Sequence, residues 1–138
     1  MTPKDKVLVQ QTFPLVVPIA DQAAALFYRR LFELDPTLKA MFKIDMREQG
    51  GKLMQMLGLA VNELDALDEL VPMVESLGRR HASYGVKDGD YDTVGSALLW
   101  TLERGLGAAF TPEVKTAWTA VYQLLASTMK GAARSVAA

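Results

Sequence analysis

The 138-residue sequence contains no cysteine and only one histidine. Without cysteine there can be no disulfide scaffold, no thiol redox motif and no cysteine-ligated zinc or iron–sulfur site. A single histidine also excludes sites that need two or more imidazoles, such as HExxH metalloproteases, three-histidine zinc sites and the two-histidine iron triad. Any chemistry that depends on imidazole must therefore use one ring.

An excess of charge and a long hydrophobic run are also absent. The 15 basic and 16 acidic residues give a formal net charge of -1, so the sequence predicts no nucleic-acid or membrane partner. The uncharged run 7–20 contains Gln10, Gln11 and Thr12 and two prolines, which is not typical of a secretion signal. No other uncharged stretch approaches the roughly 20 residues of a membrane span. Since no cysteine marks an oxidising compartment, we expect a cytoplasmic protein.

Helical periodicity is what the sequence has in quantity. Half of the residues are hydrophobic, and they recur at spacings of three and four, whereas no segment alternates long enough for a strand. We therefore predict one all-α domain, residues 1–131, with angled helix packing and a short tail, 132–138. The expected helices are 3–18 (bent or ended by Pro14 and Pro18), 19–34, 37–42, 46–67, 68–83, 91–108 and 112–130, with a polar loop at 85–90.

Enzyme motifs are missing from the sequence. It contains no Gly-x-x-x-x-Gly-Lys phosphate loop, no Gly-x-Ser-x-Gly elbow and no spacing that suggests a nucleophile–histidine pair. The acidic residues between positions 63 and 69 are typical of a solvated helix junction. The site must therefore be sought around the one histidine.

His81 lies on an apolar helical stripe with Leu70, Val74 and Leu77. A histidine in this setting is usually a core residue whose ring nitrogens find partners inside the protein. The alternative is a haem ligand, because haem iron accepts one protein histidine and leaves its opposite face to a gas. That alternative requires a second helix across the haem with small polar groups.

A helix headed by Gln49 and Leu53, which share one face, could supply those groups. The Gln49 amide has a donor and an acceptor, but its spacing alone is more typical of an exposed glutamine near a helix start. Tyr28 is compatible with a distal donor or with a core tyrosine whose hydroxyl reaches the surface. Gly50 and Gly51 predict either the close approach of a crossing helix or a frayed helix start.

Several motifs together resemble the three-over-three globin family, in particular neuroglobin and the single-domain globins of bacteria. They occur in the expected order and spacing and cover nearly the whole chain except the tail. The resemblance implies a sandwich of seven or eight helices around a haem pocket. The motifs are Phe42, Gln49-x-x-x-Leu53, the runs 77–81 and 91–95, and the runs 110–113 and 117–122 of the last helix.

The resemblance also implies residue roles. His81 takes the place of the proximal iron ligand of a non-covalent haem b, and the gas would meet Tyr28, Gln49 and Leu53. Lys52 lies near the edge where globins neutralise haem propionates, although a solvated lysine is equally typical there. The residues implied to bind the haem are Phe42, Lys52, Leu53, Leu77, His81, Val86, Tyr91 and Val94.

Two departures from relatives modify what the resemblance implies. Neuroglobin has a histidine at the Gln49 position, so bis-histidine ligation within one chain is impossible here. We expect an open ferrous iron and, in the ferric state, closure by water or Tyr28. Flavohaemoglobins pair proximal tyrosines, matched by Tyr91 and Tyr122, with a glutamate, but Ala133 stands at that position. We also expect no reductase domain after the globin domain.

The function implied is reversible binding of oxygen, NO or CO for storage or delivery, in a monomer or homodimer. One alternative is nitric oxide dioxygenase or nitrite reductase activity with an external reductase, which the missing glutamate disfavours. The other is a gas or redox sensor.

Overall fold

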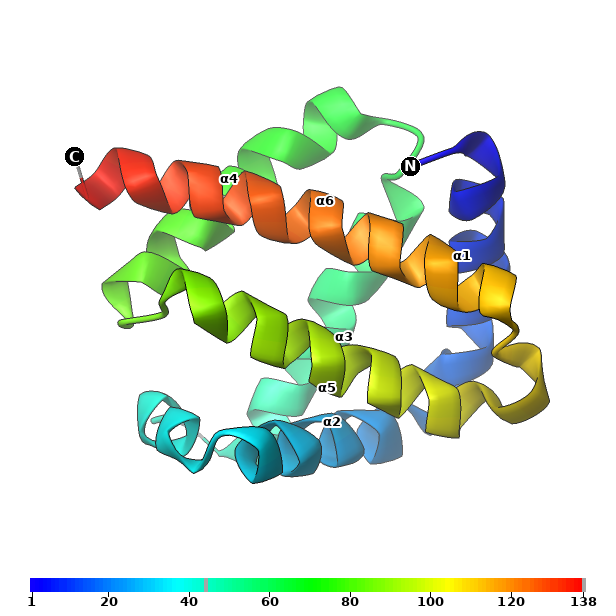
Figure 1. Cartoon of the computed structure of the whole chain (residues 1–138), viewed down its shortest axis with the longest axis horizontal. Coiled ribbons are helices and arrows are strands. Elements are labelled where there is room, and N and C mark those ends of the chain that lie inside the picture. The colour runs from blue at the N-terminus through cyan, green and yellow to red at the C-terminus, as the bar shows by residue number, and fades with distance from the viewer. Residues whose placement is uncertain (44, 138) are drawn as a thin grey trace.

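The computed structural model describes residues 1–43 and 45–137, with side chains up to residue 134. The described part contains helices and no strand, so the predicted all-α fold is confirmed (Figure 1). The described residues form six α-helices and three short 3₁₀ helices. They are α1 (Pro3–Val16), η1 (Val17–Ile19), α2 (Ala20–Leu34), η2 (Pro36–Met41), α3 (Met46–Asn62), α4 (Leu67–Ser83), α5 (Asp88–Leu106), η3 (Gly107–Ala109) and α6 (Pro112–Ala137).

The start of α1 shows how the local sequence sets a helix end. The Asp5 amide donates to the Thr2 hydroxyl at 3.1 Å, and the Thr2 amide donates to the Asp5 carboxylate at 3.0 Å. Pro3 occupies the first helical position, where its missing N–H costs nothing. Pro14 lies inside α1 without ending it, whereas Pro18 falls in η1, so the chain turns only at the second proline.

Three predicted helix boundaries differ from the structure by more than two residues. α3 ends at Asn62 instead of 67, because a turn over 63–66 separates it from α4. α5 begins at Asp88, three residues before the predicted start, since the Asp90 carboxylate accepts the Lys87 amide at 2.9 Å and caps the first turn. α6 continues to Ala137 instead of ending at 130, because alanine is the best helix former.

The helices pack at angles around one core. α6 lies against α4 and α1, and α2 lies against α5 and α3. In Figure 1, α5 and α6 cross the molecule one above the other, α2 runs below α5, and α3 passes behind α5. The Trp118 indole of α6 donates to the Thr12 hydroxyl of α1 at 2.9 Å, so the largest core side chain is also satisfied as a donor. The largest fully buried side chains are Trp118, Leu31, Leu64, Val9, Val74 and Val121.

Two glycines allow helices to approach closely. A Cβ at Gly78 of α4 would lie 2.6 Å from the Met129 Cα of α6, closer than real contacts allow. A Cβ at Gly50 of α3 would lie 2.9 Å from the Ala24 Cβ of α2. The predicted close crossing is therefore present at Gly50, whereas Gly51 faces open space and lies within the helix.

The helices of the described residues are each too short or too polar to cross a bilayer.

Candidate functional site

His81 lies in the last turn of α4, and its ring is held by the backbone one turn earlier. Its Nδ1 is 2.9 Å from the Leu77 carbonyl oxygen. In the tautomer that this contact requires, Nδ1–H donates to the carbonyl and Nε2 keeps its lone pair. No hydrogen bond to Nε2 occurs among the described residues, so this nitrogen is free to bind a metal.

Burial keeps the His81 imidazole neutral. Desolvation lowers its pKa below 6.5, and the positive charge of Arg80 adds to this effect, while the Leu77 carbonyl opposes it. A neutral imidazole is the form that ligates metals. Among the described residues no group of three or more His, Cys, Asp or Glu side chains could hold a metal ion, so His81 could ligate only a metal whose other ligands come from elsewhere.

Apolar side chains near His81 are only partly buried. The Val86 amide donates to the His81 carbonyl at 3.1 Å, which places this valine directly after the histidine turn. Covering such side chains with a flat apolar group would be favourable, because it removes apolar surface from water. Leu77 and Val86, which flank His81, are partly buried against the core, as are Phe42 after η2, Leu53 of α3 and Val94 of α5.

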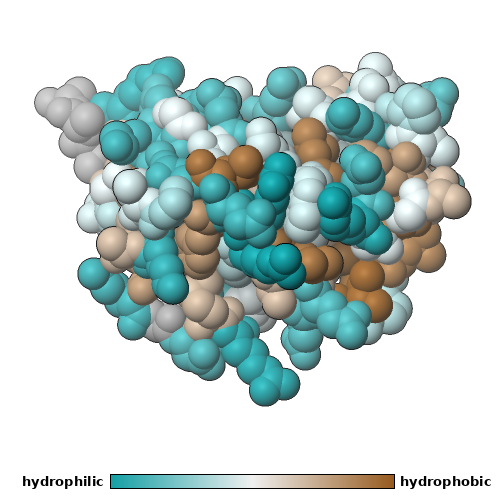
Figure 2. All heavy atoms as spheres, turned by 60° about the horizontal axis from the view of Figure 1, so that its bottom comes forward, coloured by the Kyte–Doolittle hydropathy of each residue, from teal (hydrophilic) through white to brown (hydrophobic). Residues whose placement is uncertain are grey.

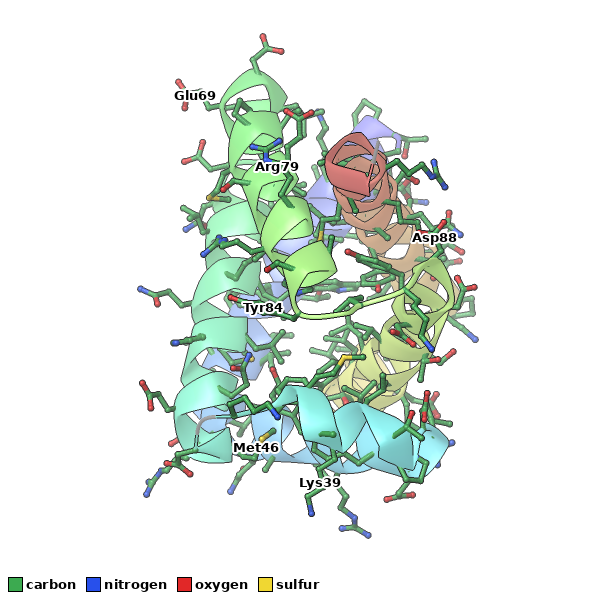
Figure 3. All side chains as sticks on the ribbon, turned by 90° about the vertical axis from the view of Figure 1, so that its left-hand side faces the viewer. Lys39, Met46, Glu69, Arg79, Tyr84 and Asp88 are labelled. Carbon is green, nitrogen blue, oxygen red and sulfur yellow. The ribbon has the colours of Figure 1, made fainter. Side chains whose placement is uncertain are left out.

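Figure 3 looks onto the end of the molecule where this region lies. α2 and η2, α3, α4 and α5 frame it, with Tyr84 on the α4 side and Met46 on the opposite side. Tyr84 is 61% exposed and its ring centroid is 6.1 Å from that of His81. The sequence analysis did not select Tyr84, although its position three residues after His81 places it on the same helix face.

A polar pair joins α2 to α3. The Gln49 side-chain amide donates to the Tyr28 hydroxyl at 3.3 Å. Burial raises the Tyr28 pKa above 10, and the bond from Gln49 only partly opposes this, so the phenol is protonated at neutral pH. Because Tyr28 accepts from Gln49, its own O–H remains available to donate. The two residues that the sequence analysis assigned to the distal side are thus brought together.

Two further aromatic rings, Phe42 and Phe32, cluster with Tyr28. Its ring lies edge-on to Phe42, with centroids 5.3 Å apart, and Phe32 lies 6.1 Å from Tyr28 and 5.4 Å from Phe42. Phe32 was not identified from the sequence. The signal was its spacing of four residues from Tyr28, which places both rings on one face of α2.

Tyr91 carries an unsatisfied buried hydroxyl. Only 6% of the residue is exposed, and its hydroxyl has no hydrogen-bond partner among the described residues. The Tyr122 hydroxyl donates to the Tyr91 carbonyl at 2.6 Å, so the tyrosine next to it is satisfied by backbone. Ala133 provides no side-chain acceptor. A buried hydroxyl without a partner costs about 1–3 kcal/mol, so Tyr91 could donate to a ligand at little further cost.

Leu53 borders a small internal cavity of about 20 Å³. The lining is almost entirely apolar and comes from α1, α2, α3, α5 and α6. Lys52, the neighbouring residue, is exposed and forms no ion pair among the described residues. Its position on α3 is compatible with a lysine that neutralises a haem propionate and with a lysine that is simply solvated.

Comparison with known proteins decides the family. A sequence profile described as Globin matches residues 25–129, which is more than half of the chain. The chain belongs to the globin family. This globin is 29% identical to neuroglobin of Danio rerio over 143 aligned positions, covering 94% of the chain and 90% of that protein. Neuroglobin of Tetraodon nigroviridis gives the same identity and coverage.

A flavohemoprotein of Rhodopirellula baltica is also similar to this globin. The two are 33% identical over 127 residues, which is 90% of the present chain but only 31% of the flavohemoprotein. The similarity therefore concerns about a third of that larger protein.

The residues of this globin fit the haem that its family generally binds. His81 offers one neutral imidazole with a free Nε2, and apolar side chains from several elements can cover a flat ring. Tyr28 and Gln49 form a second polar group, on different helices from His81. A site of this composition suits a cofactor that needs one protein ligand and an accessible second face.

Proposed function

We propose that this globin binds one non-covalent haem b through His81 and reversibly binds oxygen and other diatomic gases, including NO and CO. The observation that carries the proposal is the imidazole of His81, neutral through burial and oriented by the Leu77 carbonyl. When bound, the haem supplies the iron that coordinates the gas. The protein supplies ligation, shielding from water and hydrogen bonds.

The half-buried apolar side chains provide the shielding. Phe42 is fixed by its contacts with Tyr28 and Phe32, which suits a ring that stacks on a planar cofactor. Lys52 would neutralise a propionate at the exposed edge. The residues assigned to cover the haem faces are Phe42, Leu53, Leu77, Val86, Tyr91 and Val94.

Tyr28 and Gln49 would hold the gas from the distal side. Both can donate, because the Tyr28 phenol stays protonated and the Gln49 amide has a second N–H beside the one bonded to Tyr28. Each hydrogen bond contributes about 1 kcal/mol to retention of the gas. Leu53 limits the space beside them. Since His81 is the only histidine, no second histidine of the same chain could close a bound haem, so we expect exogenous ligands to reach the ferrous form and water or Tyr28 to close the ferric form.

Absorption spectroscopy tests the proposal directly. Spectra of the purified protein are recorded in ferric, deoxygenated ferrous and oxygenated forms, for the wild type and for His81→Leu. We expect a five-coordinate ferrous spectrum and a distinct oxygenated spectrum for the wild type, and loss of haem in the variant. A variant that keeps the wild-type haem spectrum would show that His81 is not the ligand.

Nitric oxide dioxygenation with an external reductase is the second candidate. The similarity to a flavohemoprotein and the tyrosine–glutamine pair support it. The unpartnered Tyr91 hydroxyl disfavours fast turnover, because the glutamate that flavohaemoglobins pair with proximal tyrosines is replaced by Ala133. Consumption of NO by the haem-loaded protein with a separate reductase tests it, and nitrite reduction is measured in the same way. A gas or redox sensor would require a ligand-dependent partner. Oxygen transport, a cytoplasmic location and a monomeric or homodimeric state stay predictions.

A further inference from the structure

A groove of about 480 Å³ opens between α2, η2 and the first turns of α3. Sites for small organic ligands have volumes of roughly 300–1,000 Å³, so the groove has a suitable size. Of the residues assigned above to the haem and the gas, only Tyr28 lines it. The groove is therefore a separate feature of the molecule.

Small residues create the floor of the groove. Ala24 of α2 and Gly50 of α3 meet there, since a Cβ at position 50 would lie 2.9 Å from the Ala24 Cβ. Ala25 lines the groove beside them and is exposed. A side chain at position 50 would force the two helices apart, so the floor of the groove depends on this close crossing.

Apolar walls rise on both sides of this floor. Phe32 and Tyr28 line one side from α2, and Met46 lines the other from the start of α3. Phe32 is held against Tyr28 at 6.1 Å between centroids, so this wall is preformed. The interior suits an apolar ligand body of moderate length.

Cations dominate the rim. Arg29, Lys39 and Arg47 line the groove, and Asp21 is the single carboxylate among its lining residues. Arg29 is paired with Glu33 at 3.3 Å, but neither Lys39 nor Arg47 has an ion-pair partner among the described residues. Two uncompensated cations thus stand over apolar walls.

The figures agree with this arrangement. Figure 2, which turns the α2 side toward the viewer, shows apolar patches set between hydrophilic side chains. In Figure 3, Lys39 and Met46 lie at the same end of the molecule, where η2 meets the start of α3. The first turn of α3 begins here with Met46 and Arg47, and its N-terminus is already capped, because the Asp45 carboxylate accepts the Arg47 amide at 3.4 Å.

We propose that this groove binds an amphipathic organic anion, with its apolar body between Phe32 and Met46 and its carboxylate on Lys39 and Arg47. A neutral apolar molecule would leave both cations unused, and a ligand cation would meet like charge. The shared chemistry of an apolar body and one carboxylate fits an aliphatic or an aromatic acid. The proposal does not depend on haem binding.

Calorimetric titration of the haem-loaded protein tests the proposal. Decanoate and 2-naphthoate represent the aliphatic and the aromatic acid, and uncharged 2-naphthamide controls for apolar binding alone. We expect at least one acid to bind with one-to-one stoichiometry and the amide to bind at least about tenfold more weakly. Comparison of the two acids shows whether the groove takes a chain or a ring.

Matched variants locate the binding. Lys39→Gln/Arg47→Gln removes the two unpaired cations, and Arg79→Gln/Lys115→Gln removes two exposed cations elsewhere with the same change in net charge. We expect the dissociation constant for the acid to rise about tenfold or more in the first variant and to stay within about twofold in the second. Equal losses in both variants, or no loss in either, would overturn the proposal.

A third variant tests the apolar body. Ala25→Phe places a ring into the groove from an exposed position and leaves the rim cations intact. We expect it to abolish binding of the acid while the helical circular dichroism and the haem spectrum stay unchanged. If the acid instead bound only haem-free protein, and equally in all variants, it would occupy the haem site and the groove would be excluded. That result would leave the proposed haem function intact.

Discussion

At the scale of single residues, each polar group of the site is set by one near neighbour. The Leu77 carbonyl fixes the tautomer of His81, and Gln49 leaves the Tyr28 proton free to donate. Burial acts on both in the useful direction, since it keeps the imidazole neutral and the phenol protonated. These residues therefore have the protonation states needed for ligation and for donation at neutral pH.

The first prediction concerns pH. The folded-state pKa of His81 lies below its unfolded value of about 6.5, so the unfolded chain takes up a proton first as the pH falls. Its contribution to stability is complete above about pH 6.5 and is lost as the pH falls through the lower folded pKa. We expect the urea-unfolding free energy of haem-free wild type to drop more between about pH 7.5 and about pH 5.5 than that of His81→Leu. Parallel curves would show that His81 titrates normally.

The second prediction concerns the distal donors. Tyr28→Phe and Gln49→Leu each remove one donor of about 1 kcal/mol, so each should speed oxygen dissociation roughly fivefold. The double variant should deviate from additivity, because the two side chains are bonded to each other at 3.3 Å. Flash photolysis or stopped-flow mixing measures the rates, with Tyr84→Phe as an exposed control. Unchanged rates in both single variants would exclude hydrogen bonding to the gas.

At the scale of helices, α4 is positioned by its crossing with α6. The crossing has no room for a side chain at Gly78, which is one turn before the iron-ligand position. The position of His81 relative to α6 is thus set by contact between the backbones of α4 and α6, and not by a flexible side chain between them.

The third prediction compares two glycines. Gly78→Ala places a methyl group against the backbone of Met129 and should destabilise the protein by about 1–3 kcal/mol. Gly51→Ala, on α3 with nothing within 4 Å, should stabilise it by up to about 1 kcal/mol. Chemical denaturation of the haem-free proteins gives both values, and equal effects of the two substitutions would contradict the close crossing.

Helices were predictable from the sequence where periodicity was strong, as for α2 and α4. The end of α3, the start of α5 and the end of α6 were predicted wrongly. The causes are a turn after Asn62, the cap formed by Asp90 and the alanine-rich end of α6, which are local effects that hydrophobic periodicity does not report. In the site, the pairing of Tyr28 with Gln49 was suggested by the family resemblance and is now a contact. The missing partner of the Tyr91 hydroxyl could not be predicted, since it depends on which side chains of other helices reach it.

At the scale of the whole molecule, the hydrophobic core is fully buried in some parts and partly exposed to solvent in others. Trp118 and its neighbours are fully buried, whereas the apolar residues around His81 keep partial exposure. Haem that covers them should stabilise the folded state by mass action.

The fourth prediction follows from that difference. Equimolar haem should raise the thermal unfolding midpoint of wild type by several degrees, because binding to the folded state alone is linked to stability. Amide exchange should slow around the α4–α5 turn, while α1 changes little. His81→Leu should show a much smaller rise, and an equal rise in both proteins would mean that haem binds without the histidine.

The contact between His81 and the Leu77 carbonyl also bears on how the molecule tolerates mutation. Its acceptor is a main-chain atom, so any residue that keeps α4 helical supplies it, whatever its side chain. A histidine oriented by a carboxylate would lose its orientation through one substitution at the carboxylate position. In this globin the acceptor is kept through substitutions of neighbouring side chains and is lost when the helix itself is lost.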